Sequence, residues 1–231
     1  MTGIDESGRG AFIGPMVIAG VTVRKDHDAK LKRLGVKDSK VLSPKKREKL
    51  YQEIEKLASN IIIIRVQPCK IDSYRAMGIN LDKIEAMRMA QIVDLSLQST
   101  VYVDALTSNP KRFEQLIRSF LQNKDATMVV KNYLDESVPV VSAASIIAKV
   151  ERDKAIDDLK KEVGFDFGVG YPHDARSIQF VEKLIKETKG NLPEYIRKSW
   201  VTTEVLLEKS WQRKVKDFMF GNKEGCKEEK A

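Results

Sequence analysis

The amino-acid sequence predicts an α/β domain, in which strands and helices alternate along the chain. Apolar, β-branched stretches of strand length are separated by stretches whose apolar residues recur at helical spacing. The chain has 231 residues, of which 42% are hydrophobic and 32% are charged. It can therefore bury one large core, and it is neither disordered nor fibrous.

The predicted elements follow one another up to residue 161. Residues 16–23 are apolar and β-branched after a glycine-rich turn, which predicts a buried strand. Ser43 and Pro44 suit the N-cap and first residue of a helix, behind which Leu50 and Ile54 share one apolar stripe. Further strands are expected over residues 61–66, 101–103 and 126–130, and further helices over residues 81–97, 111–121 and 138–161.

The C-terminal quarter is expected to contain only helices. After residue 170, Phe180, Leu184 and Ile185 recur at helical spacing. The last twelve residues, from Phe220 onward, are mostly Lys, Glu and Gly, which predicts a flexible tail. One domain with a helical extension is the simplest interpretation.

The composition indicates which kind of partner the protein binds and in which compartment it functions. Lys and Arg number 41 against 33 Asp and Glu, and this net charge of +8 indicates a polyanionic partner. The longest apolar run, residues 61–64, is too short to span a bilayer, and the N-terminus lacks a secretory signal pattern. Cys69 and Cys226 lack metal-ligand spacing, which fits a reducing compartment. We expect a cytoplasmic protein without a membrane or zinc site.

Residues 3–10, GIDESGRG, form the stretch that points most clearly to chemistry. On a regular strand Asp5 and Glu6 would point to opposite faces, so both can serve one site only where the backbone departs from that geometry, which Gly8 and Gly10 permit. These glycines would bring backbone N–H groups close to a ligand, with Arg9 beside them as a phosphate donor. The alternative is an acidic surface turn with an incidental arginine.

Two further carboxylates are candidates for the same site. Asp104 ends the apolar strand 101–103, and strand ends are a common place for catalytic residues in α/β sheets. Its alternative role is a turn residue that stops the strand. Asp135 precedes the long predicted helix, where an aspartate often serves only as a cap.

Together these carboxylates suggest a site for a hard divalent cation. Mg²⁺ prefers oxygen ligands and is usually held by carboxylates and substrate phosphates. Two such ions about 3.5–4 Å apart would activate water and stabilise the leaving oxygen in phosphodiester cleavage. Carboxylates clustered without metal would repel one another. A basic protein with an acidic pocket fits a metal-dependent nuclease.

Five motifs occur in order: DESGRG at 5–10, DSK at 38–40, VDA at 103–105, SAASIIAK at 142–149 and GYP at 170–172. In this combination the chain resembles ribonuclease HII, the type 2 ribonuclease H family, in its compact archaeal form. The resemblance implies a ribonuclease H-like fold, with a mixed five-stranded sheet flanked by helices and a helical C-terminal extension. We expect a catalytic domain over residues 1–170, the extension over 171–219 packed on it, and the flexible tail over 220–231.

The resemblance also implies an activity. Proteins similar to this one cut the RNA strand of RNA/DNA hybrids and nick 5′ to a single ribonucleotide in duplex DNA, leaving 3′-hydroxyl and 5′-phosphate ends. Carried over residue by residue, Asp5, Glu6, Asp104 and Asp135 would be the catalytic carboxylates that bind Mg²⁺ or Mn²⁺.

Five more residues match substrate-binding positions of the family. Gly8, Arg9 and Gly10 match the loop that reads the 2′-hydroxyl, the group that separates RNA from DNA. Tyr171 matches the tyrosine that stacks on the sugar after the ribonucleotide, and Lys40 would hold a phosphate near the cut.

The chain departs from the family pattern at two places. Ser7 stands where Ala or Gly is usual, and Tyr133-Leu134 stands where Lys and a small residue are common.

Near the C-terminus, Gln212, Val215 and Phe218 resemble a degenerate sliding-clamp-binding box. The alternative is an amphipathic helix that packs on its own domain.

Three rival functions remain. Ribonuclease HIII shares the acidic set but prefers hybrids, and it usually carries an N-terminal domain, whereas only four residues precede Asp5 here. A catalytically dead nucleic-acid-binding relative is disfavoured because all four acids are present. A resolvase or transposase of similar fold lacks support from the Gly-Arg-Gly and Gly-Tyr-Pro motifs. We expect a monomeric enzyme that acts on RNA/DNA hybrids and ribonucleotide-containing DNA.

Overall fold

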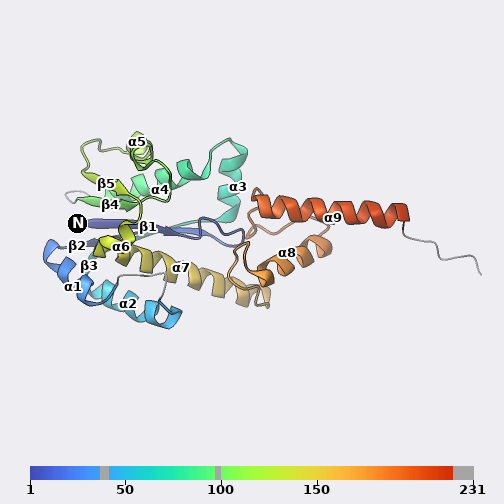
Figure 1. Ribbon diagram of the computed structural model, residues 1–231, viewed down its shortest axis with the longest axis horizontal. Coiled ribbons are helices and arrows are strands. Elements are labelled where there is room, and N and C mark those ends of the chain that lie inside the picture. The colour runs from blue at the N-terminus through green and yellow to red at the C-terminus, as the bar shows by residue number, and fades with distance from the viewer. Residues whose placement is uncertain (37–41, 97–99, 221–231) are drawn as a thin grey trace, which may run out of the picture.

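The protein, seen in a computed structural model that describes residues 1–36, 42–96 and 100–220, is built on one five-stranded sheet (Figure 1). The strand order is β3-β2-β1-β4-β5. β1 pairs antiparallel with β2 and parallel with β4, so the sheet is mixed, as expected. The strands are β1 (Thr2–Ser7), β2 (Met16–Val23), β3 (Ala58–Val66), β4 (Val101–Asp104) and β5 (Met128–Lys131).

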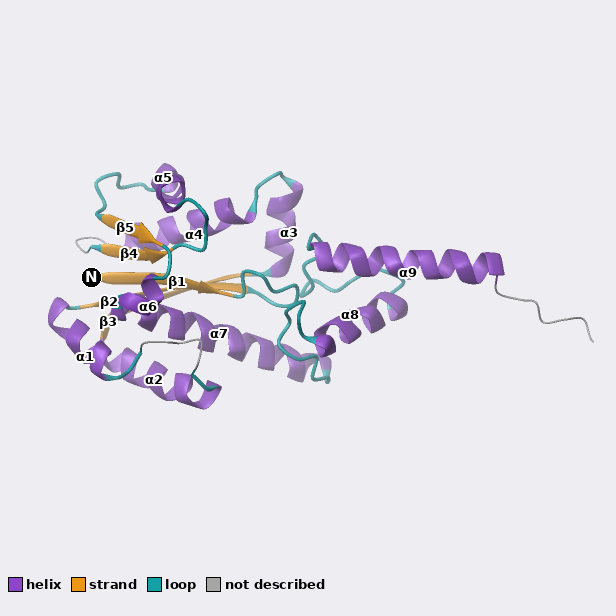
Figure 2. Cartoon of the chain, viewed as in Figure 1, coloured by secondary structure: helices purple, strands orange, loops and turns teal. Residues whose placement is uncertain are grey.

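Helices cover both faces of the sheet (Figures 1 and 2). On one face, Ile4 and Ile18 pack against buried residues of α4 and α5. On the other face, Val17 and Ala19 pack against α7, with α1 and α2 alongside. The helices are η1 (Lys25–His27), α1 (Asp28–Arg33), α2 (Pro44–Leu57), α3 (Pro68–Ala76), α4 (Leu81–Leu95), α5 (Pro110–Phe120), α6 (Leu134–Ser137), α7 (Pro139–Val163), α8 (Ala175–Glu187) and α9 (Val201–Phe220).

α7 packs closely on the central strand of the sheet because β1 carries a glycine beneath it. A Cβ atom on Gly3 would lie 2.3 Å from the carbonyl oxygen of Val140 and 2.5 Å from the nitrogen of Val141. These are backbone atoms that cannot rotate away, so only glycine fits at this position. The close approach brings the start of α7 next to the acidic end of β1.

A separate apolar cluster joins the C-terminal helices to the rest of the protein. Phe12, Ile13 and Ile156 pack there against residues of α8 and α9, including Phe180 and Leu206. In Figure 1 these two helices lie beyond the end of α7, away from the sheet. The loops at 8–14 and 167–174 therefore lie at the junction of the two parts.

Most predicted elements are confirmed within a few residues at their ends, and β2 is confirmed at both ends. The pattern does not predict β1, α1, α3 or α6, which are short or carry polar residues and glycine. The predicted tail from Phe220 overlaps the end of α9 by one residue, and residues 221–231 lie outside the described part. None of the helices in the described part of the chain combines the length and apolar character needed to span a bilayer.

Candidate active site

Three carboxylates meet at one end of the sheet. One oxygen each from Asp5, Asp104 and Asp135 lies within 4.8 Å of the other two. β1 and β4 are parallel, with Ile4 opposite Val103, so the next residue of each strand, Asp5 and Asp104, falls at the same edge. All three side chains are largely buried, at 4%, 9% and 5% exposure. The structure thus brings together three of the four predicted acids.

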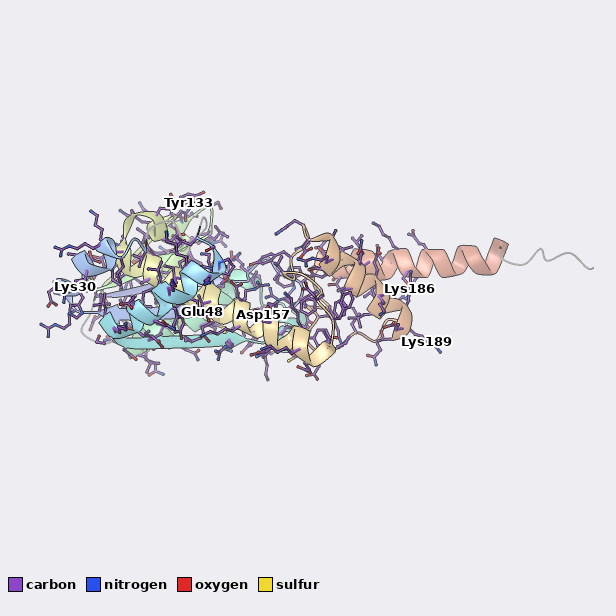
Figure 3. The ribbon with its side chains drawn as sticks, turned by 90° about the horizontal axis from the view of Figure 1, so that it is seen from below. Lys30, Glu48, Tyr133, Asp157, Lys186 and Lys189 are labelled. Carbon is purple, nitrogen blue, oxygen red and sulfur yellow. The ribbon has the colours of Figure 1, made fainter. Side chains whose placement is uncertain are left out.

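α6 places the third carboxylate. Leu134, its first residue, donates its backbone N–H to Oδ1 of Asp104 at 2.8 Å, which joins this short helix to the end of β4. The N-cap of α7 is Val138, so Asp135 does not cap the long helix. Tyr133 precedes α6 in the left-handed region, at φ 61°, and lies at the surface with 61% exposure (Figure 3).

Glu6 lies on the opposite face of the sheet from Asp5. β1 keeps regular pairing through Ser7, with Asp5 opposite Ala19 and Glu6 opposite Ile18. Ala19 belongs to the apolar cluster under α7, whereas Ile18 belongs to the cluster under α4. The expected departure from strand geometry at these two acids does not occur. β1 ends at Ser7, and Gly8 follows it with φ 85°, so the turn begins after both acids. The group of three carboxylates does not include Glu6.

Burial and mutual repulsion raise the pKa values of both adjacent acids. The pKa of Asp5 is raised chiefly by burial, against the opposing effects of Lys149 and Ser145, and Asp135 raises it further. The pKa of Glu6 is raised well above its usual value by burial and by the neighbouring charges of Asp5, Glu85 and Asp104. Charged carboxylates this close need a compensating cation.

The donor set fits a hard divalent metal ion. Every ligand atom in the group of three is a carboxylate oxygen, and no histidine or cysteine of the described residues takes part. Such a set suits Mg²⁺ or Mn²⁺ rather than zinc or copper. Asp5, Asp104 and Asp135 would hold the ion, with Glu6 close enough to add to the negative field.

The loop of residues 8–10 follows β1 directly and depends on glycine at its first position. Gly8 has φ 85°, and a Cβ atom there would lie 2.5 Å from Nε of Arg152 and 2.7 Å from the carbonyl oxygen of Pro15. The conformation and the lack of space both exclude other residues. Gly10 is exposed and less constrained, since a Cβ atom at this position would meet only an atom of the Tyr171 ring, at 4.0 Å.

The side chain of Arg9 binds α4. Its guanidinium donates to Asp82 at 2.6 Å and to Glu85 at 2.6 Å. Glu85 is buried, which raises its pKa to about 7 although Arg9 opposes the shift. The role of Arg9 as a phosphate donor stays a prediction, since two carboxylates occupy its guanidinium here.

Tyr171 lies beside the 8–10 loop. The backbone N–H groups of Phe12 and Ile13 donate to the carbonyl oxygen of Gly170 at 3.0 and 3.2 Å, which joins the two loops. The guanidinium carbon of Arg152 lies 4.5 Å from the centre of the Tyr171 ring, in cation–π geometry. The structure therefore places the expected sugar-stacking residue next to the expected 2′-hydroxyl reader.

Sequence reasoning missed two buried arginines under these loops. Arg152 is 3% exposed, and Arg197 is fully buried and donates to backbone carbonyls of the 8–14 segment. Burial lowers the pKa of Arg197 to about 9. Arg197 lies more than 180 residues from its partners along the chain, so no local pattern could have indicated it.

The remaining predicted residues are only partly described. Lys40 lies outside the described residues. Gln212 is exposed on α9, whereas the side chains of Val215 and Phe218 lie outside the described part.

Comparisons with known proteins agree with this geometry. The family model "Ribonuclease HII" matches residues 2–203. A ribonuclease HII of Methanosarcina barkeri is 40% identical over 214 residues, which cover 90% of this chain and 95% of that protein.

Two solved structures share the fold. The ribonuclease H2 of Pyrococcus horikoshii has a TM-score of 0.81 at 36% identity, over 90% of this chain and 97% of that one. A ribonuclease HII of Archaeoglobus fulgidus, solved in a complex with PCNA, has a TM-score of 0.79 at 36% identity, over 89% and 95% of the two chains. From the family match, the identity over nearly the whole chain and the three clustered carboxylates, the chain belongs to the ribonuclease HII family of metal-dependent endoribonucleases, which act on RNA paired with DNA.

Proposed function

We propose that this protein nicks duplex DNA 5′ to a single embedded ribonucleotide, besides hydrolysing the RNA strand of hybrids. The products carry 3′-hydroxyl and 5′-phosphate ends. The observation that carries the proposal is that the 8–10 loop and Tyr171 lie side by side at the end of the strand that holds Asp5. A ribose reader and a deoxyribose-stacking ring so placed would select an RNA–DNA junction.

The acidic group supplies the reaction chemistry. In this proposal Asp5, Asp104 and Asp135 hold Mg²⁺ or Mn²⁺ together, and Glu6, which lies within electrostatic reach of Asp5 and Asp104 from the other face of β1, is the fourth metal-binding acid. Without bound cations the four acids repel one another, which fits the raised pKa values of Asp5 and Glu6. Two bound ions would activate the attacking water and stabilise the leaving oxygen.

The substrate-binding residues act on the sugars at the two sides of the cut. Gly8 and Gly10 let the backbone approach the ribose closely, and Arg9 fixes the loop through α4. The ring of Tyr171, held over Arg152, packs on the next sugar only when that sugar lacks a 2′-hydroxyl. Lys40 would contact a phosphate as a point charge.

Cleavage of labelled substrates tests the proposal. A duplex with one ribonucleotide, a continuous RNA/DNA hybrid and an all-DNA duplex are each incubated with Mg²⁺, Mn²⁺ or EDTA. We expect a metal-dependent nick 5′ to the single ribonucleotide, leaving an end that a DNA polymerase can extend. Asp104→Asn should abolish the nick. Asp94→Asn is the matched control, because Asp94 accepts from the backbone N–H groups of Gln122 and Asn123 at the far end of α4.

Two outcomes would contradict the proposal. Cleavage of the continuous hybrid alone would indicate the specificity of the ribonuclease HIII type and would remove the junction role of Tyr171. Binding of all three duplexes without cleavage would leave a nucleic-acid-binding protein without catalytic activity.

We also propose that the C-terminal segment binds a sliding clamp through Gln212, Val215 and Phe218. The Archaeoglobus fulgidus relative was solved in a complex with PCNA, and it matches 89% of this chain. Gln212 is exposed on α9, which leaves it accessible to a partner. Surface plasmon resonance with an archaeal PCNA should detect binding by the full chain and at least a tenfold loss in Phe218→Ala. Equal affinity of the two proteins would refute this assignment of residues.

A further inference from the structure

Arg197 forms an unusual set of contacts beneath the 8–10 loop. Nη2 donates to the carbonyl oxygen of Gly8 at 2.7 Å, and Nη1 donates to that of Arg9 at 2.9 Å. Nε and Nη2 both donate to the carbonyl oxygen of Gly14, at 3.2 and 3.1 Å. The side chain is fully buried, and the Trp200 ring lies 4.7 Å from its guanidinium carbon. Arginine is the only residue type whose side chain carries a planar fork of donors that can bind three carbonyl oxygens in this way.

These contacts fix the orientation of two peptide planes. The chain has no cis peptide bond among the described residues, so each N–H points opposite to the carbonyl of the same peptide. The carbonyls of Gly8 and Arg9 point inward to Arg197, so the N–H groups of Arg9 and Gly10 point outward. Neither N–H donates a hydrogen bond within the described part of the chain. Two donors are therefore presented on the side away from Arg197.

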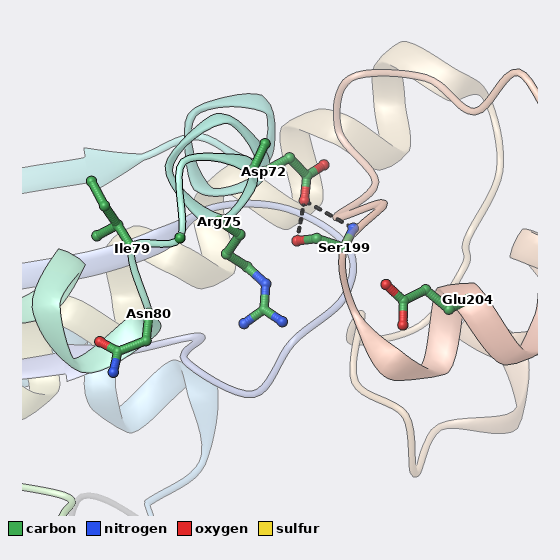
Figure 4. Close-up of a pocket in the computed structure, with 8 residues that line it drawn as sticks. Asp72, Arg75, Ile79, Asn80, Ser199 and Glu204 are labelled. Atoms are coloured by element: carbon green, nitrogen blue, oxygen red, sulfur yellow. Dashed lines mark hydrogen bonds between the residues drawn. The ribbon is translucent and has the colours of Figure 1, made fainter.

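The segment that carries Arg197 is itself held in place. The backbone N–H of Arg197 donates to the carbonyl of Phe12 at 2.9 Å. The two residues that follow Arg197 are bound to Asp72 of α3. Asp72 accepts from the hydroxyl of Ser199 at 2.6 Å and from the backbone N–H groups of Lys198 and Ser199 (Figure 4). The backbone that carries the Arg197 side chain is therefore held in place relative to the 8–10 loop.

We propose that Arg197 is a positioning residue for ribonucleotide selection, because it directs the N–H groups of Arg9 and Gly10 toward the substrate. This inference rests on the proposed function, in which the 8–10 loop reads the 2′-hydroxyl. The positive charge of the Arg197 guanidinium also polarises the peptide groups whose carbonyls it binds, and this makes the N–H groups of those peptides stronger hydrogen-bond donors. Arg197 thus couples the C-terminal extension to sugar recognition without touching the substrate.

Arg197→Lys is the most informative variant. Lysine keeps a positive charge but presents it at one point, so it cannot hold both carbonyl groups in the geometry that the guanidinium fork provides. Loss of two well-directed donors should weaken the preference for ribonucleotides by about 10- to 100-fold. Binding to all-DNA duplex depends mainly on phosphate charge and should change by less than about threefold.

The readout is a ratio of affinities. Fluorescence anisotropy in EDTA, where no strand is cut, gives the Kd for a duplex with one ribonucleotide and for the same duplex in DNA alone. Arg176→Lys is the matched control, since Arg176 lies on α8 of the same extension but is 58% exposed and pairs with Asp166 at the surface. We expect the control to keep the ratio of the wild type and Arg197→Lys to lose it.

The outcomes separate this inference from the proposed function. A wild-type protein that lacks the preference for the ribonucleotide and also fails to nick the ribonucleotide duplex in Mg²⁺ would refute the proposed function. A wild-type protein that nicks this duplex but binds it no more tightly than the all-DNA duplex would refute the role of Arg197 in ribonucleotide selection. A wild-type protein with that preference, shared in full by a folded Arg197→Lys variant, would refute only the role of Arg197.

A second measurement uses the wild type alone, in case the variant does not fold. Amide hydrogen exchange of Arg9 and Gly10 should be fast in the free protein and slowed at least tenfold by the ribonucleotide duplex, but not by the all-DNA duplex. Amides that are already protected in the free protein, or that stay unprotected with the ribonucleotide duplex, would overturn the assignment.

Discussion

Replacing Asp5 by asparagine should stabilise the metal-free protein while it removes activity. Asp5, Asp104 and Asp135 have carboxylate oxygens within 4.8 Å of one another. At an effective dielectric constant of about 20, two unit charges at this separation repel by about 3 kcal/mol. Asparagine removes two of these repulsions and keeps an oxygen that can accept the N–H of Glu6, now at 2.8 Å.

The net gain is smaller than the sum of the two repulsions. Asp5 is attracted by Lys149 and hydrogen-bonded by Ser145, and both interactions weaken when its charge is lost. We expect the free energy of unfolding to rise by about 1–2 kcal/mol at pH 8 in EDTA, which is about 2–8 °C in Tm for a chain of this size. Mg²⁺ should raise the Tm of the wild type and leave that of Asp5→Asn nearly unchanged.

The gain should depend on pH in a defined direction. The pKa of Asp5 is raised in the folded protein, so the ionised side chain lowers stability at high pH, and protonation relieves this as pH falls toward its ordinary value of 3.8. The difference in Tm between Asp5→Asn and the wild type should therefore be largest at pH 8 and shrink on acidification. Thermal melts followed by circular dichroism at several pH values measure it. A lower Tm for the variant in EDTA at pH 8, or a gain independent of pH, would refute the electrostatic reasoning.

Three further predictions concern the scaffold around the site. Gly3→Ala should lower the free energy of unfolding by about 3 kcal/mol in urea melts, because the Cβ atom of the alanine would overlap the backbone of α7 at Val140. A change below about 1 kcal/mol would contradict the packing argument. Asp72→Ala should lower the free energy of unfolding by about 1–3 kcal/mol, because three hydrogen bonds to Lys198 and Ser199 are lost. In the Asp72→Ala background, the further change Ser199→Ala should have almost no effect on stability. Additive effects of the two substitutions would show that the two residues act separately. Burial raises the pKa of Glu85 to about 7, so the wild type loses stability as this side chain ionises. In EDTA, the free energy of unfolding of Glu85→Gln relative to that of the wild type should therefore increase by about 1–3 kcal/mol as pH rises from about 4.5 to 7. A difference that does not change with pH would show that Glu85 titrates normally.

The local pattern of the sequence is enough for much of the fold. The run at 16–23 is rich in apolar and β-branched residues, and the apolar spacing after Pro44 is that of one helix face, so β2 is predicted with its observed ends and α2 with its observed first residue. Asp104 is predicted at a strand end because an apolar run stops there, and β4 ends at that residue. These features depend on neighbours within a few positions, which a sequence displays directly.

Other features depend on which segments meet in space. β1 is the central strand, yet its short polar sequence does not indicate a strand until β2 and β4 pair with it on both sides. The opposite faces of Asp5 and Glu6 follow from regular pairing with β2, and the placement of Asp135 follows from the hydrogen bond between α6 and Asp104. Long-range pairing is set by the sum of many contacts and has no signature at a single residue.

The sequence by itself determined the α/β class, and it predicted the acids of the candidate site and the loop beside them, because residue type and short spacing carry that information. Only the tertiary structure decided how the loop is held. Arg9 reaches carboxylates 73 and 76 positions away, and Arg197 reaches carbonyls up to 189 positions away. A buried guanidinium must be hydrogen-bonded, but the partners that satisfy it are chosen by the fold and not by its neighbours in the chain.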